Sequence, residues 1–285
     1  MFFFLVFVII VGWGFSYAFN NQGILYIAVA IAMTQALVGY YAGDKITLAV
    51  SGAKEVNKEV NPEIWNIVEN LTIATGLPMP KIYIINDSAP NAFATGRDPH
   101  HASIAFTSGI LQKLDKSEIE GVAAHELSHI KNYDIRVMTL TVILVGFIAL
   151  LSDFFIRWTF YGRRGSDSEG SSNIQVIGMI VGIVLAILSP IIANLIKLAI
   201  SRKREFLADA DGSLMTRYPQ GLASALKKIS QDTEPLEVAN KATAHLYIAD
   251  PLKEHKGSTR GWFVKLFSTH PPVEERIAKL NQMAQ

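Results

Sequence analysis

The 285-residue chain contains no cysteine, which excludes disulfide bonds and any metal site built from thiolates. A bound metal would therefore need histidine nitrogens and carboxylate oxygens as ligands. Charge is also scarce: 18% of residues are charged and the formal net charge is +1, so nothing indicates a nucleic-acid partner. Half of the residues are hydrophobic and the mean hydropathy is +0.26, which favours a membrane protein over a purely soluble one.

Four long apolar segments are candidate membrane spans, and they lie in two pairs. The segments cover residues 2–19, 24–42, 137–156 and 174–200. The first lacks the basic residues and the small-residue cleavage site of a secretory signal, so we interpret it as an uncleaved helix. Each pair predicts a helical hairpin. A buried hairpin of a soluble protein is the alternative for the first pair, but both of its runs approach the length that hydrocarbon requires.

Between the two hairpins, the sequence predicts a small α/β unit. A helix should begin at Pro62, a residue suited to a first turn, and end near Gly76. Residues 81–86, 91–96 and 102–107 are predicted to be short strands of one sheet. An edge strand of such a sheet can bind an extended peptide through its backbone, although an ordinary structural hairpin explains the pattern equally well. Further helices are expected at residues 222–229 and after residues 270–272.

The segment HELSH contains the strongest chemical signal in the chain, because His125 and His129 lie four residues apart with Glu126 between them. On a helix, both imidazoles would project from one face and reach one metal, while the glutamate faces the bound water. Ser117 and Glu120 fit a capping box that would start such a helix. The pattern therefore predicts a zinc hydrolase site and not two structural histidines.

A catalytic zinc has three protein ligands and one open position, and two histidines with one glutamate form a known ligand set. We expect Glu205 to be the third ligand, because Asp209 lies one helical turn further and can orient a ligand histidine. Two predicted spans separate Glu205 from HELSH, and a hairpin returns the chain to the same side of the membrane. At about 1.5 Å per helical residue, the metal should lie roughly 10–20 Å from the membrane surface.

The distribution of basic residues favours a cytoplasmic catalytic side, by the positive-inside rule. The basic residues on the side of HELSH are Lys45, Lys54, Lys58, Lys131, Arg136, Arg202, Lys203 and Arg204. A minority falls in the opposite connector at residues 157–173, namely Arg157, Arg163 and Arg164. We therefore expect a multi-pass protein of the inner or plasma membrane with a cytoplasmic catalytic domain.

Four motifs together resemble the HtpX heat-shock membrane metallopeptidases, which are relatives of the CAAX prenyl endopeptidases. The motifs are PNAFATG, HELSHIKNYD, SRKREFLADADG and STHPPVEERI, and with the apolar segments they cover most of the chain. The resemblance implies one zinc ion per chain on His125, His129 and Glu205, and a catalytic role for Glu126. It also implies supporting or substrate-orienting roles for Asp209, Asn91, His270 and Arg276. From the residues alone, His270 would be a turn residue before two prolines.

The fold class expected from these features is a mainly helical α+β membrane protein, with four transmembrane helices and a gluzincin-like zinc peptidase domain that carries a small β-sheet. The expected units are a hairpin at residues 1–43, a peptidase part at 44–136, a second hairpin at 137–200 and a peptidase part at 201–285.

The expected reaction is zinc-assisted hydrolysis of peptide bonds. Glu126 would be the general base, His270 would donate to the oxyanion, and a strand near Asn91 would hold the substrate extended. The resemblance implies that the substrates are damaged or misassembled membrane proteins, cleaved at the bilayer in a stress response.

Two other interpretations remain. An intramembrane protease of the site-2 type would use an aspartate as third ligand, and Asp211 is a candidate. The charged residues that flank HELSH count against burial in lipid: Lys116, Glu118, Glu120 and Lys131. A non-catalytic scaffold or metal-binding transporter would not need Glu126 and would carry ionisable residues in its spans, where Asp153 and Lys197 are the few candidates.

Overall fold

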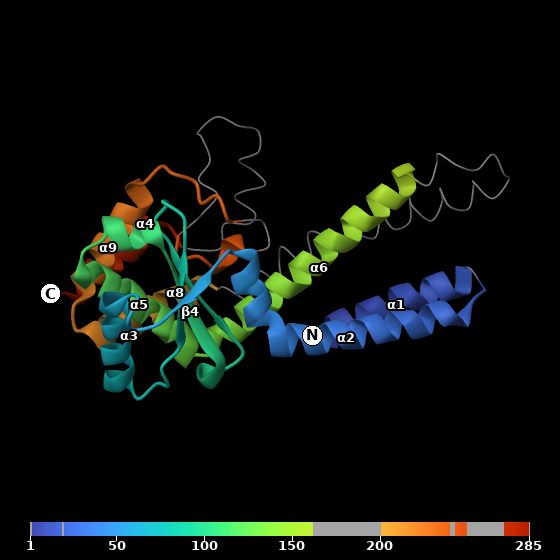
Figure 1. Ribbon diagram of the computed structural model, residues 1–285, viewed down its shortest axis with the longest axis horizontal. Helices are drawn as coiled ribbons and strands as arrows, with labels where there is room; N and C mark the ends of the chain where they lie inside the picture. Colours follow the sequence, from blue (N-terminus) through green and yellow to red (C-terminus); the bar gives the residue numbers. More distant parts are fainter. Residues whose placement is uncertain (1, 19, 162–200, 240–242, 250–270, 285) are drawn as a thin grey trace.

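The computed structural model describes residues 2–18, 20–161, 201–239, 243–249 and 271–284. Within this part of the chain, three long helices project from an α/β domain (Figure 1). They are α1 (Phe2–Ala18), α2 (Gln22–Val50) and α6 (Asp134–Tyr161). The expected span at residues 174–200 lies outside the described residues, as does most of the connector expected at residues 157–173.

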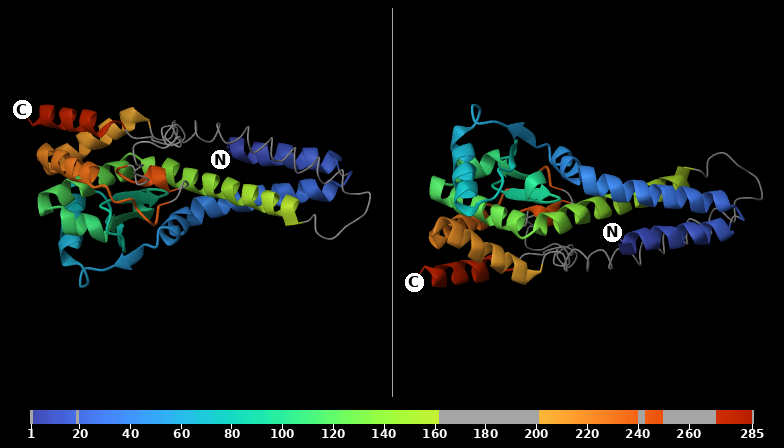
Figure 2. Two further views of the ribbon diagram at one scale, coloured as in Figure 1. Left: turned by 90° about the horizontal axis from the view of Figure 1, so that it is seen from above. Right: turned by 90° about the horizontal axis from the view of Figure 1, so that it is seen from below.

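Helices α1 and α2 form the predicted N-terminal hairpin and lie side by side in both views of Figure 2. Asn21 caps α2 by accepting a hydrogen bond from the Gly23 amide at 2.9 Å. The helix continues to Val50 and does not end at Ala42 as expected, because its last turns pack into the domain, where Leu48 is buried. Among the described residues, α2 is the one helix that is long and apolar enough to cross a membrane.

The domain contains a four-stranded mixed sheet in the order β1-β2-β4-β3. Its strands are β1 (Lys54–Val56), β2 (Lys81–Ile85), β3 (Ala92–Gly96) and β4 (Ala102–Thr107). Strands β2 and β4 are parallel, and the other two pairs are antiparallel. The three predicted strands are confirmed, whereas β1 was missed because three residues, two of them charged, show no apolar alternation. Strand β3 lies at one edge of the sheet.

In the part of the chain that the structure describes, the domain contains six further α-helices: α3 (Pro62–Thr75), α4 (Ser108–Lys113), α5 (Lys116–Lys131), α8 (Arg202–Thr216), α9 (Pro219–Gln231) and α11 (Val273–Met283). Helix α5 lies at the centre of the domain, in contact with β3, α3, α8 and α9. Its apolar side chains join strand and helix residues in one core cluster. The predicted bounds of α3 are confirmed, since Pro62 stands in its first turn and Gly76 ends it with a φ of 69°.

The capping box at the start of α5 is formed by Asp115 and Glu118, so the predicted pair of Ser117 and Glu120 was wrong. The Asp115 carboxylate accepts from the Glu118 amide at 3.0 Å, and the Glu118 carboxylate accepts from the Asp115 amide at 2.8 Å. Both pairs have the same spacing, so the local pattern could not separate them. Packing determines which pair forms the cap, because Ser224 and Lys228 of α9 also bind the buried Glu118.

Candidate metal centre

Helix α5 brings His125, Glu126 and His129 into the interior of the domain. Both histidines are nearly inaccessible to solvent, with exposed fractions of 1% and 3%. Their Nε2 atoms lie 3.2 Å apart and the two rings are perpendicular. Glu126 follows His125 directly and is equally buried. The predicted helical context of HELSH is therefore confirmed, and its two imidazoles converge on one point.

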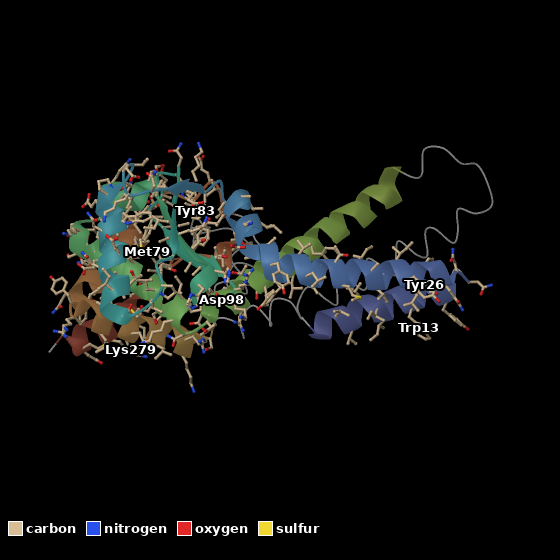
Figure 3. All side chains as sticks on the ribbon, turned by 60° about the horizontal axis from the view of Figure 1, so that its bottom comes forward. Trp13, Tyr26, Met79, Tyr83, Asp98 and Lys279 are labelled. Atoms are coloured by element: carbon tan, nitrogen blue, oxygen red, sulfur yellow. The ribbon has the colours of Figure 1, made fainter. Side chains whose placement is uncertain are left out.

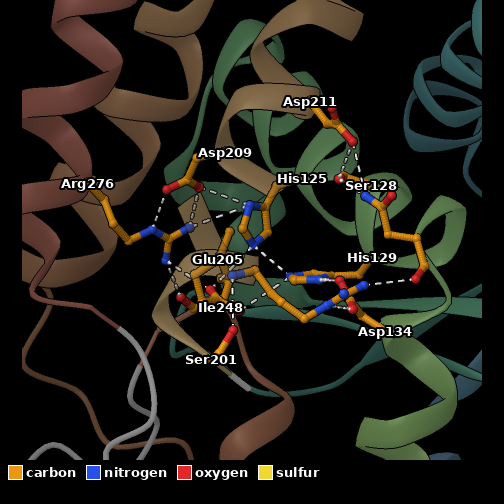
Figure 4. Close-up of polar contacts among 12 residues, drawn as sticks. His125, Ser128, His129, Asp134, Ser201, Glu205, Asp209, Asp211, Ile248 and Arg276 are labelled. Atoms are coloured by element: carbon orange, nitrogen blue, oxygen red, sulfur yellow. Dashed lines mark hydrogen bonds and ion pairs between the residues drawn. The ribbon is translucent and has the colours of Figure 1, made fainter. Parts of the chain in front are cut away.

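Helix α8 supplies a third donor to the same point (Figure 4). Its first turn is capped by the Ser201 side chain and contains Glu205, whose side chain is fully buried. The carboxylate oxygens of Glu205 lie 3.9 Å from His125 Nε2 and 3.5 Å from His129 Nε2. Tetrahedral zinc with bonds near 2.1 Å places its ligand atoms about 3.4 Å apart. Because the three donor atoms lie within 4.8 Å of one another, these residues fit a zinc ion.

A glycine allows α8 to approach α5 this closely. A Cβ atom added at Gly212 would lie 3.0 Å from the His125 backbone nitrogen. The neighbouring Asp211 does not join the donor cluster. Its carboxylate accepts hydrogen bonds from Ser128 at 3.3 Å and from Asn132 at 3.0 Å. This placement counts against the interpretation in which an aspartate at this position is the third ligand.

The second nitrogen of His125 is held by a buried ion pair between α8 and α11. Asp209 Oδ1 lies 3.0 Å from His125 Nδ1, and Arg276 binds both oxygens of Asp209 at 2.6 and 2.8 Å. Burial alone would raise the pKa of Asp209, but the Arg276 charge and the hydrogen bonds lower it to about 2. Burial lowers the pKa of His125 to about 4, so its imidazole is neutral, as a metal ligand requires.

His129 has its own carboxylate partner, which the sequence did not reveal. Asp134 Oδ2 lies 3.0 Å from His129 Nδ1, and Arg204 of α8 binds the other oxygen of Asp134. Burial would lower the pKa of His129, but the hydrogen bond to Asp134 and the Glu205 charge raise it to about 9, so a binding metal ion would displace the proton on its Nε2. Tyr133, with a φ of 59°, makes the turn that returns Asp134 to the histidine. The available signal was an aspartate five residues after His129 in HELSHIKNYD.

Three predicted site residues remain: Asn91, Arg276 and His270. The buried carboxamide of Asn91 donates to Ala249 O at 3.2 Å and accepts from the Ala249 amide at 3.4 Å. Arg276 is fully buried and donates to Ile248 O as well as to Asp209, which in turn contacts His125. His270 lies outside the described residues.

Comparison with known proteins shows the family to which this chain belongs. The profile of peptidase family M48 matches residues 58–284. A protease HtpX homologue from Tropheryma whipplei (strain TW08/27) is 47% identical over 253 residues, which are 89% of this chain and 83% of the relative. A second homologue, from Dictyoglomus thermophilum, is 49% identical over 251 residues, covering 87% of this chain and 79% of the relative.

A solved structure agrees in fold. The crystal structure of S. mikatae Ste24p superposes with a TM-score of 0.55 at 20% identity, over 96% of this chain and 62% of Ste24p. This chain thus spans less than two thirds of the Ste24p chain, and the likeness concerns the fold. The resemblance to HtpX metallopeptidases inferred from the four motifs is confirmed. The chain therefore belongs to peptidase family M48 and is a membrane-bound zinc metalloprotease.

Proposed function

We propose that this protein cleaves unfolded or misassembled proteins at the cytoplasmic surface of the cell membrane, as part of a stress response. The observation that carries the proposal is the convergence of His125, His129 and Glu205 beside Glu126, in a domain attached to long apolar helices. Relatives named protease HtpX homologue support the substrate class, since the motifs of this chain resemble a heat-shock family.

The roles of the chain's own residues follow from their contacts. When bound, zinc supplies a Lewis acid that polarises the scissile carbonyl and acidifies the attacking water. Glu126 takes the proton from that water and passes it to the leaving amine. Asp209 and Asp134 accept the outer N–H groups of His125 and His129 and so fix the rings in the orientation that presents Nε2 to the metal.

In this proposal the edge strand β3 and the nearby Asn91 position the substrate. Strand β3 is in contact with α5, so a peptide bound to its edge would run beside the zinc ligands. Asn91, which immediately precedes β3, would bind the peptide backbone with its carboxamide. His270 would donate to the oxygen on which negative charge develops. In this scheme Arg276 acts through Asp209 and not by direct contact with substrate.

The membrane arrangement we propose has four spans: residues 2–19, 24–42, 137–156 and 174–200. Large apolar side chains of α2 that face outward support it, as do aromatic residues near the far end of the hairpin, where Trp13 and Tyr26 project away from the protein (Figure 3). Trp and Tyr are enriched where a helix leaves the hydrocarbon. The majority of basic residues supports a cytoplasmic catalytic domain.

The test is cleavage of β-casein, an unfolded protein, by the full chain purified in detergent and loaded with zinc. We expect cleavage that a chelator stops and added zinc restores. Glu126→Gln should retain zinc, because Glu126 is not a ligand, and should lose cleavage by roughly 10²- to 10⁴-fold. A zinc-loaded Glu126→Gln protein that cleaves β-casein at the wild-type rate would falsify the proposed role of Glu126.

A further inference from the structure

Another part of the chain already forms backbone hydrogen bonds with the outer edge of β3. The Ile248 amide donates to Ala92 O at 3.0 Å, as an added strand would. The Asn91 carboxamide binds both backbone groups of Ala249, the carbonyl at 3.2 Å and the amide at 3.4 Å. All five residues of β3 are buried, although the strand lies at the edge of the sheet. We call residues 246–249 the strap.

Ile248 of the strap lies close to Glu205 and Arg276 (Figure 4). The Ile248 carbonyl accepts a hydrogen bond from Arg276 Nη1 at 3.1 Å, and the same nitrogen lies 3.8 Å from Glu205 Oε2. A peptide that paired with the start of β3 would need the Ala92 carbonyl and the Asn91 carboxamide, which the strap now binds. Substrate and strap therefore cannot occupy this edge at the same time.

The side chains of the strap are held as those of a bound apolar peptide would be. The Tyr247 ring packs edge to face on Phe93, with centroids 5.2 Å apart, and both rings are fully buried. Leu246 lies in the same apolar cluster, and Ile248 belongs to the main core cluster. Backbone pairing with an edge strand, together with apolar side chains in pockets, is the way such strands bind peptides.

We propose that the strap is a built-in competitor of the substrate, and that an extended apolar segment of an unfolded protein binds β3 only after the strap has left it. This inference rests on the proposed function, since it assigns a regulatory state to the same site. The described conformation is the closed state, in which the strap occupies the start of the β3 edge. Native proteins also cover sheet edges permanently with loops, and a permanent cover would stay in place during catalysis.

Two variants weaken the strap without touching the metal ligands. Ile248→Pro removes the amide that binds Ala92 O, and Ala249→Pro removes the amide that binds Asn91. One net hydrogen bond corresponds to roughly a 2- to 10-fold change in the closing equilibrium, so we expect KM for β-casein to fall by about that factor with little change in kcat. Tyr247→Phe is the matched control, because it keeps the ring on Phe93 and every strap amide, and its KM should not change.

The decisive measurement is hydrogen exchange of the strap amides, which does not depend on the proline variants folding. Zinc-loaded Glu126→Gln protein in detergent is incubated with and without β-casein, while binding of β-casein is followed separately. We expect bound β-casein to speed exchange at residues 248 and 249 by about tenfold. If these amides stay protected while β-casein binds, the proposal that the strap competes with substrate is wrong, and the proposed function is unaffected. Zinc-loaded wild type that neither binds nor cleaves β-casein would overturn the proposed function, and the strap with it.

Discussion

The N-terminal helices and the metal centre differ in which side chains they expose and which they bury. Helix α2 exposes large apolar side chains, including Ile27 at 62% and Leu37 at 57%. The metal centre does the reverse and buries charged ones, since Glu205 and Arg276 have no solvent exposure. Each arrangement is unfavourable in water unless something covers the apolar surface and something pairs the charges. The comparison shows that one chain is built for two environments.

In the proposed membrane arrangement, hydrocarbon stabilises the apolar helices, whereas at the metal centre the charges stabilise one another. Arg276 pairs with Asp209, Asp209 contacts His125, and Glu205, which we propose as the third ligand, lies within 4 Å of Arg276. The two regions meet where α2 and α6 enter the domain, because Gly43 of α2 packs directly on Thr139 of α6. Thr139 in turn binds Gly96 at the end of β3. The apolar helices are thus joined by direct contacts to the strand that we propose binds substrate.

The largest expected effect comes from breaking the ion pair of the buried region. Asp209→Asn would leave Arg276 buried without its carboxylate, at a cost of about 3–5 kcal/mol in the free energy of unfolding. It should also weaken zinc binding by roughly 10- to 100-fold, because His125 loses the acceptor that orients it. Competition with a chelator and chemical denaturation measure the two effects. Asp211→Asn, a partly exposed neighbour, is the control, and equal zinc affinities in the two variants would contradict the role of Asp209.

A smaller effect should come from placing a charge on each exposed apolar surface in turn. Leu37→Lys on α2 should hinder membrane insertion by about 2.5–3.5 kcal/mol, because the ammonium would lie in hydrocarbon. Ile73 on α3 is 75% exposed but belongs to the domain, so Ile73→Lys should change stability by no more than about 0.5 kcal/mol. The fraction of each variant that resists alkaline extraction from membranes measures the difference. Equal extraction of the two variants would mean that α2 does not contact lipid.

The smallest effect concerns the contact between α5 and α8. Gly212→Ala would place a Cβ atom 3.0 Å from the His125 backbone, so we expect a loss of about 1 kcal/mol in stability as the helices separate slightly. Gly146 of α6 offers the control, because an added Cβ meets no atom within 4 Å, and Gly146→Ala should be neutral or slightly stabilising. Thermal unfolding in detergent compares them. A destabilised Gly146→Ala beside an unaffected Gly212→Ala would show that this contact is not tight.

The sequence predicted those parts of the site that depend on periodicity. His125 and His129 follow from a spacing of four on a helix, and Glu205 with Asp209 follows from the same spacing after the predicted membrane hairpin. Asp134 escaped prediction because a left-handed residue, Tyr133, reverses the chain between it and His129. A bond of that kind depends on one backbone torsion, which the residue pattern does not encode.

Tertiary contacts explain what else the sequence did not reveal. The capping role of Asp115 depends on the buried Glu118, which α9 holds from more than one hundred positions further along the chain. Strand β1 exists because it pairs with β2, and its own three residues carry no strand pattern. Helix α2 extends beyond its apolar run because its final turns are buried in the domain. Each of these features depends on contacts with residues that are distant in the sequence.

The central claim is that the metal site is divided between α5 and α8, with Glu205 as the ligand that completes it. Zinc content at limiting free zinc, measured on folded wild type, Glu205→Ala and Asp211→Ala in parallel, tests it most directly. We predict one zinc ion per chain in wild type and Asp211→Ala, and loss of zinc in Glu205→Ala. Full zinc content in Glu205→Ala together with loss in Asp211→Ala would contradict the claim.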